Sequence, residues 1–398
     1  MLVFMKIVNL FLITVFSVMF FSCVEKASDD RDVTDIDYLD NEDLPMNAFV
    51  DAIEVVPLET DSTCLIDQFH KIAFYDEIGV YLIIDKKQTV YLFSADGRYI
   101  SNSKACRGNG PNEYTILTDA VYNPYTKHIE ILNPFGIIYA YDLSFQFQGK
   151  KDLKNGNIHT FSRFYPLDDI SYILLPTMLG EKDAVICFCD YSRQEIASTE
   201  VYIDDFVCTL TMNYNPFVQM NDRLYFLPLC LDYTIYNIGE NRQLNKYITY
   251  SFGGKDVRKE EMEERFGDVS DKKTSEKSLK KTVQNMEKIN DYLLRSDYPV
   301  PVIKMMDDSY LYFYIMRNGG RETVIYDRMS GRIILHSNKQ NPSLNFCLHL
   351  NGKQLYSIMH PYEIDRYIDK HLLDADNLDK INSIKEDDNP IIIKYRLK

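Results

Sequence analysis

The sequence predicts an all-β fold, a six-bladed β-propeller with helical insertions that follows an N-terminal lipoprotein signal peptide. Two observations predict it. Six short runs rich in aromatic and β-branched residues recur along the chain, each after a polar turn. Most are followed by a second apolar run with one aromatic, and four such aromatics (Phe93, Tyr141, Phe188 and Tyr236) are 48, 47 and 48 residues apart. A strand-rich period in the forties is typical of propeller blades, because one small sheet cannot bury both of its faces alone.

The six runs fit buried strands by length and composition, and we expect them to be the inner strands of the blades. They are Val80–Asp85, His128–Asn133, Ser171–Pro176, Leu224–Leu229, Leu311–Met316 and Leu355–His360. Two further strands are expected at the ends of this region, Ala52–Leu58 and Pro390–Leu397. We expect these two to complete the last blade together, because closing the ring removes exposed sheet edges.

The N-terminus predicts export and lipidation. Residues 1–22 form a signal peptide, in which Lys6 precedes the apolar run Ile7–Phe21 and the small residue Ser22. The run is short for a membrane span, which needs about 20 apolar residues. Ser22-Cys23 resembles a bacterial lipobox, so we expect Cys23 to carry lipid; an ordinary secreted protein or a single anchor helix is the alternative. The chain would then be an outer-membrane lipoprotein of the cell envelope, periplasmic or surface-exposed.

The rest of the chain divides into a tether, the propeller and two insertions. Residues 23–44 are polar and acidic, which predicts a flexible tether, and residues 45–398 form the propeller. Charged segments at about 255–297 and 362–387 interrupt the blade pattern and predict helices that either cover a blade edge or form a lid over a binding face. In the first insertion, residues recur at helical spacing at Leu279, Val283, Met286, Ile289 and Leu293. In the second, the same spacing occurs at Ile364, Tyr367, Ile368, His371 and Leu372.

Three segments carry a resemblance to a known family. They are Val55–Thr60 (VVPLET), Arg107–Tyr114 (RGNGPNEY) and Asp387–Tyr395 (DDNPIIIKY). Together they resemble the six-bladed β-propeller lipoproteins common in gut anaerobes, relatives of the NHL and TolB-like propellers. The resemblance covers about residues 45–398. It implies the fold but no activity, because fold does not dictate function.

The loop Arg107–Tyr114 is the candidate binding site. Arg107 and Glu113 could bind polar groups of a ligand, and Tyr114 could stack on a sugar ring or another ligand. The structural alternative is that the loop bridges two blades, with Arg107 paired to Glu113 and with a tight turn that depends on Gly110.

A calcium site is a second candidate. Asp85, Asn133 and His360 end three of the six runs at equivalent positions, and would lie on one rim of the ring. Such ligands can hold Ca²⁺. The other three runs end in residues that cannot serve as ligands, and Asp and Asn also simply begin turns. No cofactor is therefore expected, with calcium as the alternative.

Composition and motifs narrow the function. The net charge of -15 argues against nucleic-acid binding. The sequence contains no nucleophile elbow, zinc-protease helix motif or phosphate-binding loop. We therefore expect a non-enzymatic binding or interaction module, tethered to a membrane through lipid, that engages a glycan, peptide or partner protein. The alternatives are a hydrolase or lyase that acts on carbohydrate or lactone substrates with acids in the axial funnel, and a purely structural envelope component.

Overall fold

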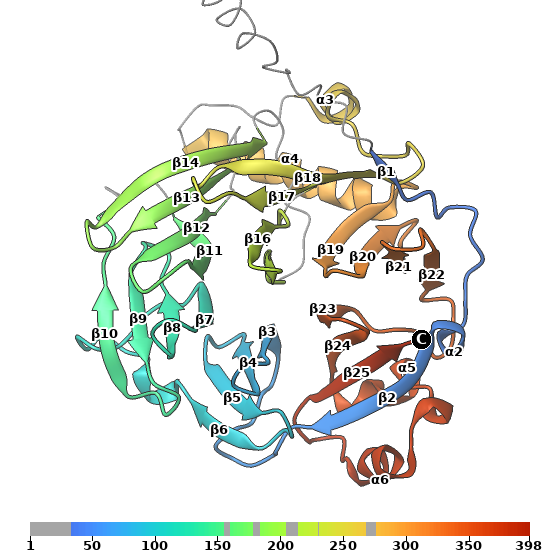
Figure 1. Ribbon diagram of the computed structural model, residues 1–398, viewed down its shortest axis with the longest axis horizontal. Coiled ribbons are helices and arrows are strands. Elements are labelled where there is room, and N and C mark those ends of the chain that lie inside the picture. Colours follow the sequence, from blue (N-terminus) through green and yellow to red (C-terminus); the bar gives the residue numbers. More distant parts are fainter. Residues whose placement is uncertain (1–32, 155–159, 178–183, 204–213, 230, 268–275) are drawn as a thin grey trace, which may run out of the picture.

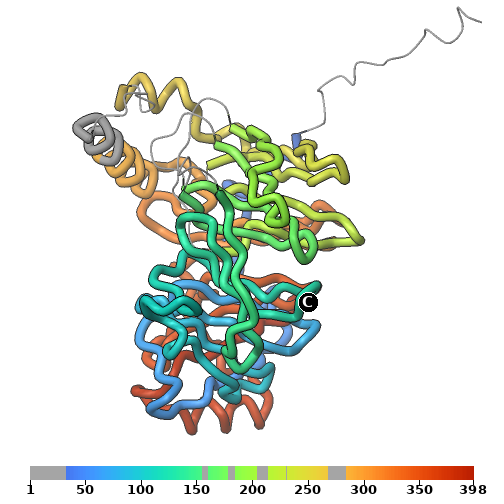
Figure 2. Tube along the Cα trace, turned by 90° about the vertical axis from the view of Figure 1, so that its left-hand side faces the viewer, coloured from blue at the N-terminus to red at the C-terminus, as the bar shows by residue number. Residues whose placement is uncertain are grey.

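The computed structural model describes residues 33–398 except 155–159, 178–183, 204–213, 230 and 268–275. It confirms the predicted six-bladed β-propeller (Figure 1). Six antiparallel sheets surround a central axis, and the ring is seen from its edge in Figure 2. The signal peptide and Cys23 lie outside the described residues.

Blades 1 to 3 take their strands in chain order. Blade 1 consists of β3 (Phe69–Tyr75), β4 (Val80–Asp85), β5 (Val90–Ser94) and β6 (Tyr99–Asn102). Blade 2 consists of β7 (Asp119–Asn123), β8 (His128–Leu132), β9 (Ile138–Tyr141) and β10 (Phe147–Lys151). Blade 3 consists of β11 (Phe161–Pro166), β12 (Ser171–Pro176), β13 (Ala184–Asp190) and β14 (Glu195–Ile203).

Blades 4 and 6 also use strands from the N-terminal part of the chain. Blade 4 consists of β15 (Phe217–Met220), β16 (Arg223–Phe226), β17 (Thr234–Ile238) and β18 (Leu244–Ser251), with β1 (Thr34–Asp35) added at its edge. Blade 5 consists of β19 (Val300–Met306), β20 (Tyr310–Arg317), β21 (Gly320–Asp327) and β22 (Ile333–Ser337). Blade 6 consists of β23 (Cys347–Asn351), β24 (Gln354–Met359), β25 (Ile391–Leu397) and β2 (Val50–Pro57).

The six apolar runs are the second strands of the blades, so the expectation that they are the innermost strands is wrong. The innermost strands are β3, β7, β11, β15, β19 and β23 (Figure 1). A second strand has a strand on each side and a neighbouring blade on each face, which is why β4 and β12 are buried along their whole length. An innermost strand faces the axis along one edge and carries polar groups there, such as Lys71.

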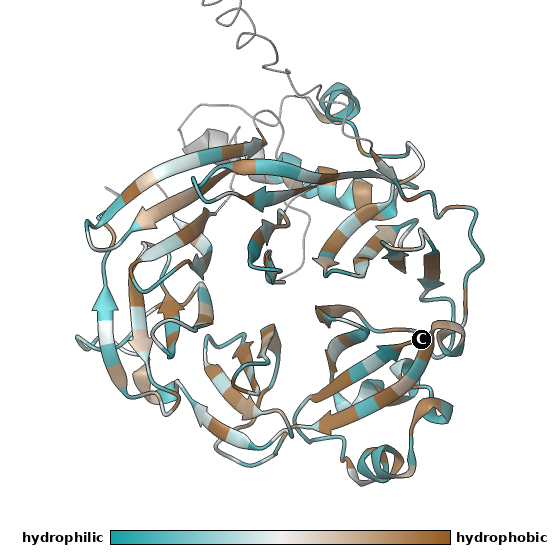
Figure 3. Ribbon diagram, viewed as in Figure 1, coloured by the Kyte–Doolittle hydropathy of each residue, from teal (hydrophilic) through white to brown (hydrophobic). Residues whose placement is uncertain are grey.

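The predicted closure of the ring by the two ends of the propeller region is confirmed. Strand β25 lies between β24 and β2, and it pairs with β2 in antiparallel register, with Val56 opposite Ile392. The side chains of Ile391, Ile392 and Ile393 are fully buried. Brown bands of apolar residues in Figure 3 run through these strands and through those of the other blades.

Both insertions contain helices. The described helical segments are α2 (Met46–Phe49), η1 (Lys104–Cys106), α3 (Lys259–Phe266), α4 (Glu276–Arg295), η2 (Pro361–Glu363), α5 (Ile364–Tyr367), η3 (Lys370–Leu372) and α6 (Ala375–Ser383). Within the described ranges, none of the helices combines the length and the apolar character needed to span a membrane.

Helices α4 and α6 cover parts of the blades. In α4 the side chains of Met286, Ile289 and Leu293 are buried in the core; Leu279 and Val283 lie among residues whose side chains are outside the described part. In α6, Asn377 Oδ1 accepts a hydrogen bond from Val55 N, at 2.8 Å, and Lys380 Nζ donates to Val55 O, at 3.1 Å. Helix α6 thereby satisfies backbone groups on the free edge of β2.

Residues 33–49, which we call the strap, lie along the outer edges of blades 4, 5 and 6 (Figure 1). Strand β1 pairs with the end of β18, Ile36 and Tyr38 are fully buried, and Asp43 accepts hydrogen bonds from Ser337 N and Oγ, at 2.8 and 2.6 Å. The prediction of a flexible tether over 23–44 is therefore wrong for residues 33–44. Ile36 and Tyr38 alternate with acidic residues and form one apolar face, which the acidic average composition of the segment conceals.

Candidate functional site

A cavity of about 670 Å³ lies on the axis, among the turns that join the first and second strands of the blades. We call this end of the ring the cavity face, and the end at which the first strands begin the closed face. All six blades contribute to the lining, which consists of residues 72–77, 121, 122, 124, 165, 166, 215, 217–221, 305–309 and 348–352. The size falls within the range of small-ligand sites.

Four carboxylates line one side of the cavity. Asp76 and Glu77 follow the innermost strand of blade 1, and Asp307 and Asp308 follow that of blade 5. We call these four residues the acidic arc. Neither lysine nor arginine occurs among the lining residues, and His349 of blade 6 is the only basic side chain there. The cavity therefore carries negative charge.

Asp307 is the most enclosed member of the acidic arc. Its Oδ1 accepts hydrogen bonds from Ser309 N and Tyr310 N, at 2.8 and 2.7 Å. Its Oδ2 is buried and has no hydrogen-bond partner among the described residues. Burial raises the pKa of this carboxyl, and the neighbouring charge of Asp308 raises it further, although the backbone amides of Tyr310, Ser309 and Gly352 act in the opposite direction.

The other two aspartates of the acidic arc are held by amides. Asn221 Nδ2 donates to Asp308 Oδ1 at 2.7 Å, and Asn351 Nδ2 donates to Asp76 Oδ2 at 3.1 Å. His349 Nε2 lies 3.7 Å from the same Asp76 oxygen, close enough for an ion pair when the ring is protonated but too far for a hydrogen bond. That buried nitrogen has no hydrogen-bond partner among the described residues.

Aromatic rings line the other side of the cavity, and we call Tyr75, Tyr122, Tyr165 and Phe217 the aromatic arc. The ring centroids of Tyr75 and Tyr122 are 5.6 Å apart, and those of Tyr165 and Phe217 are 5.2 Å apart. Burial raises the pKa of Tyr165 to about 12, and its hydroxyl donates to Gln219 Oε1 at 3.2 Å. These rings offer apolar surface, and the three tyrosines add hydroxyl groups, which suits the binding of a ligand with both apolar and polar parts.

A buried ion pair lies on innermost strands beside the cavity lining. Lys71 Nζ of β3 is 2.5 Å from Asp119 Oδ1 of β7, and both side chains are at most 4% exposed. Asp119 Oδ2 also accepts from Phe164 N of β11, at 3.2 Å. Burial lowers the pKa of Lys71, and the facing carboxylate opposes that shift. This pair links the first three blades around the axis.

The structure places the loop Arg107–Tyr114 on the closed face, between blades 1 and 2, with every predicted residue in a structural contact. Tyr114 is fully buried, and its hydroxyl donates to Gln88 O at 2.9 Å and lies 2.6 Å from Ser103 Oγ. A ring in this position cannot stack on a ligand. The predicted binding role of Tyr114 is therefore incompatible with its burial.

Arg107 and Glu113 have separate partners. Arg107 Nη1 donates to Lys87 O, and Glu113 Oε2 accepts from Gly110 N at 2.8 Å. The Arg107–Glu113 pair that the structural alternative assumed is therefore not formed. A Cβ at Gly108 would lie 2.0 Å from Glu113 Oε2, the end of a flexible side chain that can move, and Gly110 is not among the glycines with positive φ.

The three candidate calcium ligands lie at the closed face, in three different blades. The oxygens of Asp85 and Asn133 are engaged in their own turns: Asp85 Oδ1 accepts from Thr89 N at 2.8 Å, and Asn133 Oδ1 accepts from two backbone amides at 2.9 Å. His360 stacks between Phe69 and Tyr362, with centroid distances of 5.3 Å to each. Within the described ranges, no three His, Cys, Asp or Glu side chains form a group that could hold a metal ion.

The sequence reasoning missed the cavity because it placed the wrong strand at the axis. A signal was present: acidic or amide residues follow the first strands at Asp76-Glu77, Asn221-Asp222 and Asp307-Asp308. Each pair resembles an ordinary hairpin turn when read alone. Only the assignment of the first strands to the axis brings these turns together.

Comparison with known proteins identifies the family. The family described as "Domain of unknown function (DUF4934)" matches residues 32–396. The chain belongs to this family. No curated protein matches the chain.

Two solved structures from Bacteroides are similar to this DUF4934 member. A presumed exported protein of Bacteroides fragilis has a TM-score of 0.66 and 16% identity, over 92% of this chain and 99% of that one. A member of the DUF4221 family from Bacteroides vulgatus has a TM-score of 0.46 and 10% identity, over 87% of this chain and 98% of that one. The first likeness supports the fold.

Proposed function

We propose that this protein is a lipid-anchored binding module of the cell envelope, and that its ligand binds at the axial cavity. The observation that carries the proposal is the contrast in hydrogen bonding on the two faces of the ring. Buried Asp307 Oδ2 and His349 Nε2 at the cavity lack hydrogen-bond partners among the described residues. Buried polar atoms without partners are costly, and a ligand that supplies the partners would remove the cost.

The ligand would be a glycan, a peptide or a partner protein. The test is an unbiased glycan-array and co-purification screen with the full chain, repeated with Asp308→Asn at the cavity face. The matched control is Asp379→Asn on α6, an exposed acid at the outer edge of blade 6. A ligand captured by the wild type and by the α6 variant but lost by Asp308→Asn supports the proposal. A screen that yields no ligand or partner contradicts it.

The lipid anchor is a separate part of the proposal. The short apolar run before Ser22-Cys23 supports lipidation of Cys23, in a periplasmic or surface-exposed outer-membrane lipoprotein. The segments VVPLET, RGNGPNEY and DDNPIIIKY support kinship with gut-anaerobe propeller lipoproteins and, through them, with NHL and TolB-like propellers. Cys23→Ser should release the protein from the membrane fraction. A variant that remains in that fraction would mean that residues 7–21 are an anchor helix.

A hydrolase or lyase acting on carbohydrate or lactone substrates is the second candidate function. Asp307 favours it, because a carboxyl with a raised pKa can hold the proton that a general acid donates. Turnover of any member of a broad substrate panel, abolished in Asp307→Asn while the variant stays folded, would establish an enzyme. Folded wild-type protein that turns over none of the panel would reject this candidate.

A further inference from the structure

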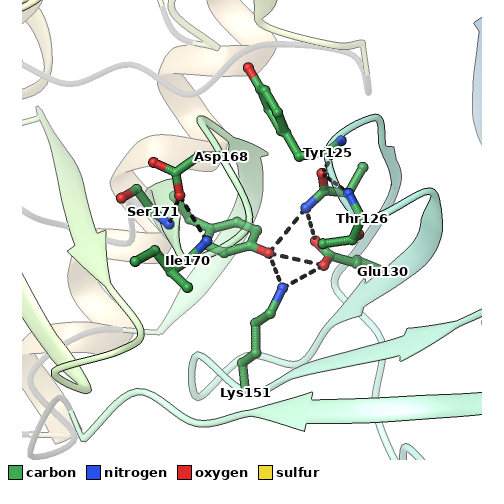
Figure 4. A network of polar contacts seen from close by, with 9 residues as sticks. Tyr125, Thr126, Glu130, Lys151, Asp168, Ile170 and Ser171 are labelled. Atoms are coloured by element: carbon green, nitrogen blue, oxygen red, sulfur yellow. Dashed lines mark hydrogen bonds and ion pairs between the residues drawn. The ribbon is translucent and has the colours of Figure 1, made fainter.

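The acids of this protein fall into two groups according to whether they have a basic partner. Away from the cavity, several acids within the blades are paired with lysine or arginine. Glu130 is fully buried and its Oε1 lies 2.8 Å from Lys151 Nζ, while the Tyr172 hydroxyl donates to the same oxygen at 2.9 Å (Figure 4). Arg317 Nη2 and Glu322 Oε1 are 2.8 Å apart in blade 5. These pairs neutralise charge within the fold.

The acidic arc is different. None of its four carboxylates forms an ion pair with a lysine or arginine of the described part of the chain, and the protonatable contact is His349 beside Asp76. Amides hold Asp76 and Asp308 in place without neutralising them. Carboxylates gathered around a concave surface reinforce one another's potential, which attracts and orients a cation. A positive charge from outside the chain would complement these carboxylates.

The aromatic arc limits what kind of cation fits. A bare ion would need several oxygens around one point, and no such cluster occurs among the described residues. A side chain with an apolar stem and a charged end would use both arcs, its stem against Tyr122 and Tyr165 and its charge among the carboxylates. At about 670 Å³ the cavity has room for more than a single ion.

We propose that the axial cavity binds the ammonium or guanidinium group of a lysine or arginine side chain, presented by a peptide segment of a partner and flanked by apolar residues. This inference rests on the proposed function and narrows its ligand to a basic peptide. Charge complementarity selects the ligand: neutral glycans can donate hydrogen bonds to the carboxylates but form no ion pair with them, and acidic ligands are repelled.

The experiment measures binding to the full chain by calorimetry with defined probes. The first is a short capped peptide of alternating lysine and tyrosine, and the second is the same peptide with every lysine ε-acetylated. A neutral chito-oligosaccharide and its deacetylated, amine-bearing form are the third and fourth. Asp308→Asn and Asp76→Asn test the acidic arc, and Asp379→Asn on α6 is the charge-matched control. Thermal unfolding verifies that each variant is folded.

We expect the lysine peptide to bind and the acetylated peptide to bind at least about tenfold more weakly, because acetylation removes the charge that the carboxylates contact. Asp308→Asn and Asp76→Asn should each weaken binding by about tenfold, whereas Asp379→Asn should leave it unchanged. Added salt should weaken binding, because the carboxylates are partly exposed to solvent. Asp308→Lys, which reverses the charge, should abolish binding.

Four results would overturn the inference, and they separate it from the proposed function. Equal binding of the two peptides, or binding of the neutral oligosaccharide alone, would reject a cationic ligand while leaving a binding module in place. Binding of the deacetylated oligosaccharide without the lysine peptide would reject the peptide source of the cation. Failure of all four probes would reject the inference; the proposed function would then be decided by the capture screen described above.

Discussion

The two faces of this propeller treat polar groups in opposite ways. On the closed face, Asp85 and Asn133 accept hydrogen bonds within their own turns, and the Tyr114 hydroxyl bonds to Gln88 O and Ser103 Oγ outside its loop. On the cavity face, Asp307 Oδ2 and His349 Nε2 are buried without hydrogen-bond partners among the described residues, and the acidic arc has no lysine or arginine.

The segments that carry the family resemblance lie where the ring closes and where blades meet, away from the cavity. Asn389 of DDNPIIIKY donates from Nδ2 to Glu59 O and Cys64 O, at 2.7 and 3.0 Å, and its Oδ1 accepts from Ile66 N at 2.8 Å. It thereby pins the chain that follows VVPLET to the last blade. These motifs therefore belong to the ring closure and the blade junctions, and none of them lines the cavity.

Removal of the closing strand should have the largest effect. Deletion of Pro390–Lys398 exposes the partners of three fully buried isoleucines, leaves β2 without a strand partner and leaves β24 paired with β23 alone. Burial of each such side chain is worth about 1.5–3 kcal/mol, against a total stability of about 5–15 kcal/mol. We expect aggregation or loss of the cooperative thermal transition. An unchanged melting temperature would contradict ring closure by β25.

A methyl group at Gly97 should weaken the junction between blades 1 and 6. Gly97 has φ +86°, and a Cβ there would lie 2.2 Å from Pro57 O, a backbone atom of β2 in blade 6. Gly97→Ala should therefore lower the free energy of unfolding by about 2–3 kcal/mol. Gly331→Ala is the matched control, because its φ is +72° but nothing lies within 4 Å. Its loss should be about 1 kcal/mol, and equal losses in denaturant titrations would show that the junction contact adds nothing.

Removal of one tyrosine hydroxyl should lower the free energy of unfolding more on the closed face than on the cavity face. Tyr114→Phe leaves Gln88 O and Ser103 Oγ without that bond in a fully buried site, so the free energy of unfolding should fall by about 1–2 kcal/mol. Tyr165→Phe removes a bond to Gln219 beside the cavity, where solvent can replace it. Its cost should be at most about 0.5 kcal/mol. A larger loss for Tyr165→Phe in thermal unfolding would reverse the proposed contrast.

Replacement of Asp307 by asparagine should raise the free energy of unfolding slightly at neutral pH. The fold raises the pKa of Asp307, so it favours the protonated carboxyl, and wild-type stability falls as pH rises from the ordinary carboxyl pKa through the raised value. Asp307→Asn avoids that loss. We expect a gain of at most about 1 kcal/mol at neutral pH, which disappears at acidic pH below the ordinary carboxyl pKa. Destabilisation at neutral pH would mean that the Asp307 charge supports the fold.

The fold was predictable from the sequence because it depends on local, repeated signals. The spacing of Phe93, Tyr141, Phe188 and Tyr236 reflects one strand per blade, and every blade must bury that strand in the same way. The stretch Ile391–Ile393 likewise identified a buried strand at the end of the chain, and the apolar run near residue 55 provided its partner. Apolar patterning records burial directly, so it predicted the strands and the closure.

The site was decided by the tertiary structure. Apolar patterning marks the most enclosed strand, which is the second of each blade, so it misplaced the axis and drew attention to Asp85, Asn133 and His360 on the closed face. Asp76 and Asp307 are separated by more than half of the chain and come together only when the ring closes. Whether a carboxylate has a basic partner depends on that three-dimensional arrangement, because the net charge of a sequence does not record which charges meet.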